Sequence, residues 1–144
     1  MSDLEARIVR ALERHPEVLV AYLFGSRARG TDRRGSDVDV AVLLREDDDA
    51  RADAEALDRR LALIADLSAA TGTDGVDVVV LNEAPVALAY RVLRDGRLLV
   101  SRDDRARIEH WVRTVDRYID MAPFRRVQEE GLRHRLREGR FGRS

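Results

Sequence analysis

Three aspartates lie in apolar segments where carboxylates are uncommon and could do chemistry. Asp37 and Asp39 are separated by one valine, and Asp77 lies within the apolar run Val76–Leu81. In a β-strand, residues two apart point to the same side, so Asp37 and Asp39 project together while Val38 faces the other way. Carboxylates held so close repel each other unless a cation lies between them. The spacing therefore predicts a site for a hard divalent cation with oxygen ligands, for which magnesium fits best.

Asp77 is predicted to complete this site from a second strand. Burying an ionised carboxylate without a partner is costly, so an aspartate inside an apolar strand indicates that a partner lies close. We expect the strand at residues 76–81 to pack beside the strand that carries Asp37 and Asp39. Three carboxylates on neighbouring strands can hold two Mg²⁺ ions, which bridge a triphosphate and lower the pKa of an attacking hydroxyl. Asp77 is then also placed to accept the proton of the acceptor group.

A Gly-Ser pair precedes these aspartates and ends an apolar run. Gly25 allows the backbone to approach a phosphate, and the Ser26 hydroxyl with nearby backbone N–H groups can donate to its oxygens. Ten residues separate Ser26 from Asp37, and this segment supplies further candidate nucleotide contacts, namely Arg27, Arg29, Gly30 and Ser36. A Gly-Ser pair or an Asp-x-Asp alone is a weak signal. Their joint occurrence with a third aspartate favours metal-dependent nucleotide chemistry.

Composition narrows the classes of protein that remain. Cysteine is absent and only 3 histidines occur, which excludes disulfides, thiolate catalysis and Cys-based zinc sites. The formal net charge of −1 argues against nonspecific nucleic-acid binding by the whole chain. No apolar run is long enough to cross a bilayer, and the acidic amino terminus does not resemble a secretory signal, so we expect a cytoplasmic protein with no membrane contact.

Hydrophobic periodicity and turn residues predict an α/β (α+β) chain whose strands position the aspartates. The predicted strands are Val18–Phe24, Asp37–Leu44, Val76–Leu81 and Arg97–Val100. The predicted helices are Leu4–Leu12, Ala52–Ala70, Val86–Arg94 and a long final helix, Asp103–Ala122. Residues 1–122 are expected to form one domain, and residues 123–144 an arginine-rich basic tail.

Two helices carry apolar residues at helical spacing. In the second helix the predicted core-facing stripe is Leu57, Leu61, Ile64 and Leu67. The final helix carries Ile108, Trp111, Val112, Val115 and Ile119. We interpret Trp111 and Tyr118 as core or helix-packing residues, with a partner-binding face as the alternative, and His110 as solvated.

The carboxylate and Gly-Ser motifs resemble those of the DNA polymerase beta-type nucleotidyltransferase superfamily. Residues 23–30 and 36–42 match its two motifs, residues 76–81 lie where its third carboxylate strand belongs, and residues 22–100 resemble the minimal nucleotidyltransferase (MNT) proteins. This resemblance implies a mixed β-sheet backed by helices, with a long C-terminal helix. It assigns Gly25 and Ser26 to the triphosphate, and the aspartate triad to the metals. Val80 departs from relatives that carry a second acidic residue there, which leaves the triad intact.

The resemblance also implies a biological role. MNT proteins are usually paired with a HEPN-type (HepT-like) ribonuclease toxin, and antitoxins among them transfer AMP from ATP to a tyrosine of the toxin. By this resemblance the chain uses ATP, works in a hetero-oligomer with such a toxin, and offers its final helix and arginine tail as docking surfaces. Two alternatives stay open: transfer to a small molecule such as an aminoglycoside, and a non-catalytic antitoxin that acts by occlusion.

Overall fold

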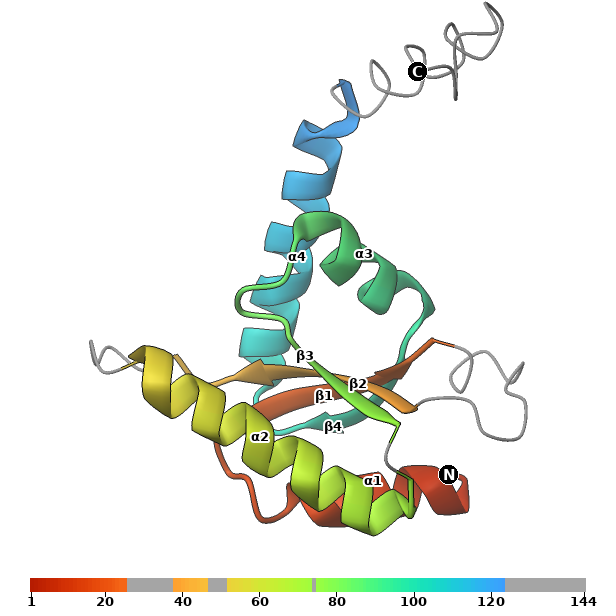
Figure 1. The fold of residues 1–144 in the computed structure, drawn as a ribbon. Helices are drawn as coiled ribbons and strands as arrows, with labels where there is room; N and C mark the ends of the chain where they lie inside the picture. Colours follow the sequence, from red (N-terminus) through yellow and green to blue (C-terminus); the bar gives the residue numbers. More distant parts are fainter. Residues whose placement is uncertain (26–37, 47–51, 74, 124–144) are drawn as a thin grey trace, which may run out of the picture.

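The computed structural model describes residues 1–25, 38–46, 52–73 and 75–123, and contains four helices and four strands within them (Figure 1). The predicted elements are all present, with ends shifted by at most a few residues. In chain order they are α1 (Asp3–Leu12), β1 (Val18–Phe24), β2 (Val38–Leu44), α2 (Ala52–Thr71), β3 (Val76–Val80), α3 (Val86–Asp95), β4 (Arg97–Ser101) and α4 (Asp104–Asp120).

The four strands form one mixed sheet in the order β3-β2-β1-β4. β1 runs antiparallel to both β2 and β4, whereas β2 and β3 run parallel. Figure 1 shows α1 and α2 on one face of this sheet and α3 and α4 on the other. This arrangement confirms the predicted mixed sheet backed by helices and the predicted pairing of the two aspartate-bearing strands.

The face covered by α1 and α2 holds the larger core. Val38, Val40 and Val42 alternate along β2 and are fully or almost fully buried there. They pack in one cluster with Leu12 of α1 and Leu67 of α2, among others. Burying each such side chain stabilises the fold by roughly 1.5–3 kcal/mol. Because the valines occupy this face, the residues between them must point to the opposite face.

The opposite face carries a second cluster beneath α3. Ala41 and Leu43 of β2 are buried against Ala89 and Val92 of α3. α3 is in turn tied to α4 by Tyr90 and Tyr118, whose rings stack with centroids 3.7 Å apart. The interpretation of Tyr118 as a helix-packing residue is therefore confirmed, and such a pair adds about 0.5–1.5 kcal/mol beyond its buried area.

The predicted stripe of α2 was only partly right. Leu67 is fully buried and Ile64 partly so, but Leu57 and Leu61 are 58% and 54% exposed. The second fully buried leucine of this helix is Leu63, which the sequence analysis did not select. The helix is rich in leucine and alanine around much of its circumference, so its periodicity left the buried face ambiguous.

The interpretation of α4 needs a larger correction. Its apolar stripe faces outward, and Trp111 is 51% exposed instead of lying in a core. His110 and Thr114 of the same helix are buried, so the interpretation of His110 as solvated was wrong. The side of α4 that packs on the molecule therefore carries the polar residues His110 and Thr114, and His110 hydrogen-bonds to the backbone of Leu81.

The connection between α1 and β1 is fastened by an arginine that the sequence analysis did not identify. Guanidinium N–H groups of Arg102 donate to the carbonyl oxygens of Leu12, His15 and Val18, each at 2.8 Å. His15 itself is buried, and its Nε2 lies 2.6 Å from the Asp66 carboxylate on α2. These contacts fix the α1 layer to the sheet. Within the described part of the chain, no helix is long and apolar enough to span a membrane.

Candidate active site

Asp39 and Asp77 lie side by side on the two parallel strands. They are direct partners in the β2–β3 register, so both side chains project from the same face of the sheet, opposite Val38 and Val40. Asp39 is half-buried, whereas Asp77 is exposed. The expectation that Asp77 is buried was therefore wrong, because β3 is the edge strand of the sheet and leaves its carboxylate open to solvent. The pairing expected from that argument is nevertheless present.

Gly25 meets the Asp39 carboxylate at the end of β1. Phe24, the last residue of β1, is the register partner of Asp39. Gly25 follows it with φ +78°, a left-handed conformation that side chains rarely adopt. A Cβ atom at this position would overlap Oδ2 of Asp39. The glycine therefore leaves space for the carboxylate, a role that the sequence analysis did not anticipate beside its predicted approach to phosphate.

The remaining predicted site residues fall outside the part of the chain that the structure describes. These are Ser26, Arg27, Arg29, Gly30, Ser36 and Asp37. Among the described residues, no group of three or more acidic or histidine side chains is gathered closely enough to hold a metal ion. Two of the three predicted aspartates, Asp39 and Asp77, thus lie in the described part of the chain, with Gly25 beside Asp39.

The donor set of this pair fits a magnesium ion. Two carboxylates project from adjacent strands at the same register position, one of them open to solvent. Mg²⁺ prefers such hard oxygen donors, and it commonly combines one or two protein carboxylates with water and substrate phosphates. An exposed strand edge leaves room for those additional ligands.

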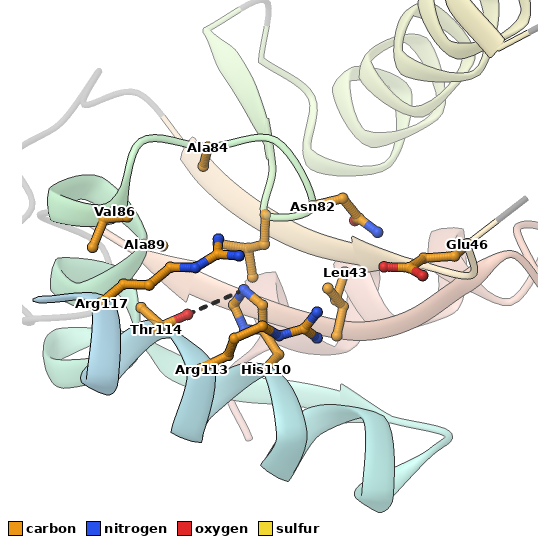
Figure 2. Close-up of a pocket in the computed structure, with 11 residues that line it drawn as sticks. Leu43, Glu46, Asn82, Ala84, Val86, Ala89, His110, Arg113, Thr114 and Arg117 are labelled. Carbon is orange, nitrogen blue, oxygen red and sulfur yellow. Dashed lines mark hydrogen bonds between the residues drawn. The ribbon is translucent and has the colours of Figure 1, made fainter.

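A pocket of about 260 Å³ lies farther along the same face of the sheet (Figure 2). Leu43 and Leu81 line it, each four residues beyond an aspartate of the pair, which places them about 13 Å away along their strands. Figure 2 shows the guanidinium groups of Arg113 and Arg117 reaching from α4 over this pocket. Two guanidinium groups and the Glu46 carboxylate therefore line this pocket.

His110 forms a buried wall of the pocket. Its Nε2 lies 3.4 Å from the Thr114 hydroxyl. Burial lowers the pKa of His110 below its usual value, and the neighbouring positive charge of Arg113 lowers it further, whereas a hydrogen bond to the Leu81 backbone opposes the shift. The imidazole is therefore held in its neutral form. No sequence signal identified this pocket, because its residues come from three separate segments.

Comparison with known proteins places the site in a family. The chain matches the family described as Polymerase beta, Nucleotidyltransferase over residues 6–105, a region that includes Gly25, Asp39 and Asp77. The chain belongs to this family. The predicted resemblance is therefore confirmed, and the matched region ends just after the start of α4.

A curated relative is Protein adenylyltransferase MntA of Shewanella oneidensis, which is 36% identical over 98 residues. That match covers 66% of this chain and 63% of the relative, so it spans less than two thirds of the relative's length.

Solved structures extend the likeness over more of the chain. A crystal structure described as a toxin-antitoxin with AMP-PNP is 29% identical, with a TM-score of 0.71, and the match covers 89% of this chain and 97% of that one. A second is described as a tri-AMPylated Shewanella oneidensis HEPN toxin in complex with MNT antitoxin. It is 26% identical, with a TM-score of 0.66, and the match covers 90% of this chain and 95% of that one.

Proposed function

We propose that this protein transfers AMP from ATP to a tyrosine of a HEPN-type (HepT-like) ribonuclease toxin and thereby acts as its antitoxin. The observation that carries the proposal is the register pairing of Asp39 and Asp77 beside Gly25 in a member of the nucleotidyltransferase family. The names of the similar proteins support the choice of nucleotide and acceptor, because they include an adenylyltransferase, an AMP-PNP complex and an AMPylated HEPN toxin.

The proposed reaction is an in-line displacement at the α-phosphorus of ATP. The tyrosine oxygen forms a bond to this phosphorus, the bond to the pyrophosphate oxygen breaks, and pyrophosphate leaves. Asp77 is open to solvent and is the group proposed to take the tyrosine proton. Gly25 and Ser26 are proposed to hold the triphosphate through backbone N–H groups and the hydroxyl.

Asp39, Asp77 and Asp37 are the residues proposed to hold magnesium. When bound, the metal neutralises charge that develops on the transferred and departing phosphates. Asp39 is held in place by strand β2. Because Gly25 has no side chain, it leaves room for the Asp39 carboxylate.

The test is intact-mass analysis of the protein and of a HEPN-type toxin from the same source after incubation with Mg²⁺ and each nucleoside triphosphate. We expect the toxin to gain the mass of AMP when ATP is supplied. Replacing Asp37 and Asp39 together by asparagine should slow transfer at least about a hundredfold while folding and toxin binding persist. Asp58→Asn, on the exposed part of α2, is the matched control and should leave the rate unchanged.

Other outcomes would select the alternatives. Binding of the toxin with no mass gain, together with full toxin inhibition by the doubly substituted protein, would replace the proposal with occlusion. A mass gain on an aminoglycoside, but not on the toxin, would indicate a small-molecule acceptor.

A further inference from the structure

The outward face of α4 carries a row of large apolar side chains. Ile108, Trp111, Val112 and Ile119 are 52%, 51%, 47% and 60% exposed, and Val115 lies between them on the same side of the helix. We call these five residues the α4 stripe. The opposite side of the helix contacts the molecule through the buried His110 and Thr114 and through Tyr118, which stacks on Tyr90, so the stripe is not the face on which α4 mainly packs.

The geometry of the stripe suits a helical partner. Its members recur every three or four residues from 108 to 119, which extends over about 17 Å of helix. Apolar rows with this spacing are the surfaces by which helices dock on one another. A contiguous exposed apolar face that includes a tryptophan is unusual for a protein that works alone, and tryptophan is prominent among residues that dominate binding energy.

The stripe also lies outside the part of the chain shared with the nucleotidyltransferase family. The family match ends at residue 105, and all five stripe residues follow it. The stripe is therefore not part of the region that defines the family, and its exposed apolar residues need another explanation.

Charges along one edge of the stripe indicate the chemistry of its occupant. Helical geometry places Arg105, Glu109, Asp116 and Asp120 on this edge. Arg105 and Glu109 are joined by an ion pair of 3.0 Å and cancel each other. Asp116 and Asp120 form no ion pair with any residue that the structure describes. The edge is therefore acidic and complements a basic partner.

We infer, on the basis of the proposed function, that the α4 stripe docks an amphipathic helix of the acceptor protein whose apolar face is bordered by arginine or lysine. An acceptor that cleaves RNA must carry basic surfaces to hold the phosphate backbone, which matches the acidic edge. Docking through α4 holds the acceptor near the active site without contacting the reacting atoms. It should therefore govern the KM for the acceptor and leave kcat unchanged.

The charges favour a basic partner over a second copy of this chain as the occupant. In a two-fold antiparallel pairing of α4 helices, the same edge of each helix meets itself. Asp116 and Asp120 of one copy would then lie near the Arg105–Glu109 ion pair of the other, which offers them no net positive charge.

The test compares binding of the full-length protein to its HEPN-type toxin with that of two variants. Trp111→Ala combined with Ile119→Ala should weaken binding at least about tenfold, because both side chains are exposed and are removed from the proposed contact. Asp116→Arg combined with Asp120→Arg deletes no apolar contact and should weaken binding at least about threefold, more at low salt than at high salt.

Leu57→Ala combined with Leu61→Ala is the matched control, because these leucines are equally exposed but lie on α2. This variant should bind the toxin within about twofold of the unmodified protein. Circular dichroism checks that all variants are folded. When the rate of AMP transfer is measured over a range of toxin concentrations, the Trp111/Ile119 variant should show an unchanged kcat and a raised KM for the toxin.

The inference fails if both α4 variants bind the toxin as tightly as the unmodified protein. It also fails if sedimentation shows that the isolated protein dimerises and that the Trp111/Ile119 variant is monomeric, because the stripe would then bind a second copy. Toxin binding that depends on the stripe without any AMP transfer would sustain the docking surface and reject the proposed function. AMP transfer to a toxin whose binding does not change in either α4 variant would support the proposed function and reject the docking surface.

Discussion

At the scale of single residues, Gly25 is the most informative position because a methyl group there would collide with the Asp39 carboxylate. Gly25→Ala should displace that carboxylate and slow AMP transfer about a hundredfold, the loss typical of misplacing a reacting group by about 1 Å. The measurement is the transfer rate under saturating ATP and Mg²⁺. Gly72→Ala is the control, since Gly72 has a similar φ of +71° but nothing within 4 Å of its added Cβ.

Both substitutions carry the same backbone penalty, and they differ only in the neighbouring carboxylate. Equal loss of activity in the two variants would mean that backbone strain, and not displacement of Asp39, explains the effect. Stability measured by urea denaturation should fall similarly in both.

His110 supplies a prediction for pH dependence. Its pKa in the folded protein is lowered from the usual value of 6.5, so the unfolded chain takes up the proton first as the pH falls. Its stabilising contribution is therefore complete above pH 6.5 and is lost as the pH falls toward the pKa of the folded state. His110→Gln should flatten this part of the profile, measured as the free energy of unfolding between pH 5 and 8 (about the range in which histidines titrate). An unchanged slope below pH 6.5 would contradict the assignment.

The positions of single side chains were predicted correctly where they depended only on the alternation of side chains along a strand. The common facing of Asp39 and Asp77 followed from the side-chain period of a strand together with parallel pairing. The contact between Gly25 and Asp39 did not follow, because it depends on how β1 ends beside β2. His110 was also missed, since its burial depends on residues after β3 that line the same pocket and are distant in the sequence.

At the scale of elements, the sequence predicted which segments form helices better than it predicted which faces they bury. Strand limits were accurate because β-branched runs are bounded by glycine, proline and charged residues. The helices α2 and α4 have apolar residues that recur regularly, but periodicity alone cannot tell a core from a docking surface. Trp111 and Leu57 were expected inside and are half-exposed for this reason.

Arg102 tests how the elements are joined. Its guanidinium donates to three carbonyl oxygens in the segment from α1 to β1, and a lysine ammonium cannot reproduce this planar fork. Arg102→Lys should lower the free energy of unfolding by about 1–2 kcal/mol. Urea denaturation measures this, and Arg105→Lys, at a side chain that is 89% exposed, is the control and should change it by less than about 0.5 kcal/mol. Equal stability of the two variants would show that the clamp contributes little.

At the scale of the whole molecule, the Asp39–Asp77 pair and the α4 stripe lie on separate elements, so different substitutions can test them separately. The pair lies on the neighbouring strands β2 and β3, whereas the stripe lies on the exposed side of α4, opposite the buried His110 and Thr114. The family fold and the strands that carry Asp39 and Asp77 were predictable from local patterns. The residues of the stripe were predictable as well, but their outward orientation was not, because periodicity does not show whether an apolar face meets the core or a second molecule.

Thermal stability offers a test of metal-dependent nucleotide binding that needs no acceptor. AMP-PNP with Mg²⁺ at about a hundred times its Kd should stabilise the protein by about 2.7 kcal/mol, which corresponds to a rise in Tm of roughly 5–10 °C for a chain of 144 residues. Chelating the metal with EDTA should remove most of this rise, because the nucleotide phosphates are proposed to reach Asp39 and Asp77 through the ion. Asp39→Asn combined with Asp77→Asn should show a similarly small rise, although the loss of two neighbouring negative charges can raise its Tm before nucleotide is added. A full rise in EDTA would mean that the nucleotide binds through other groups, and the carboxylate pair would then lose its assignment as the metal site.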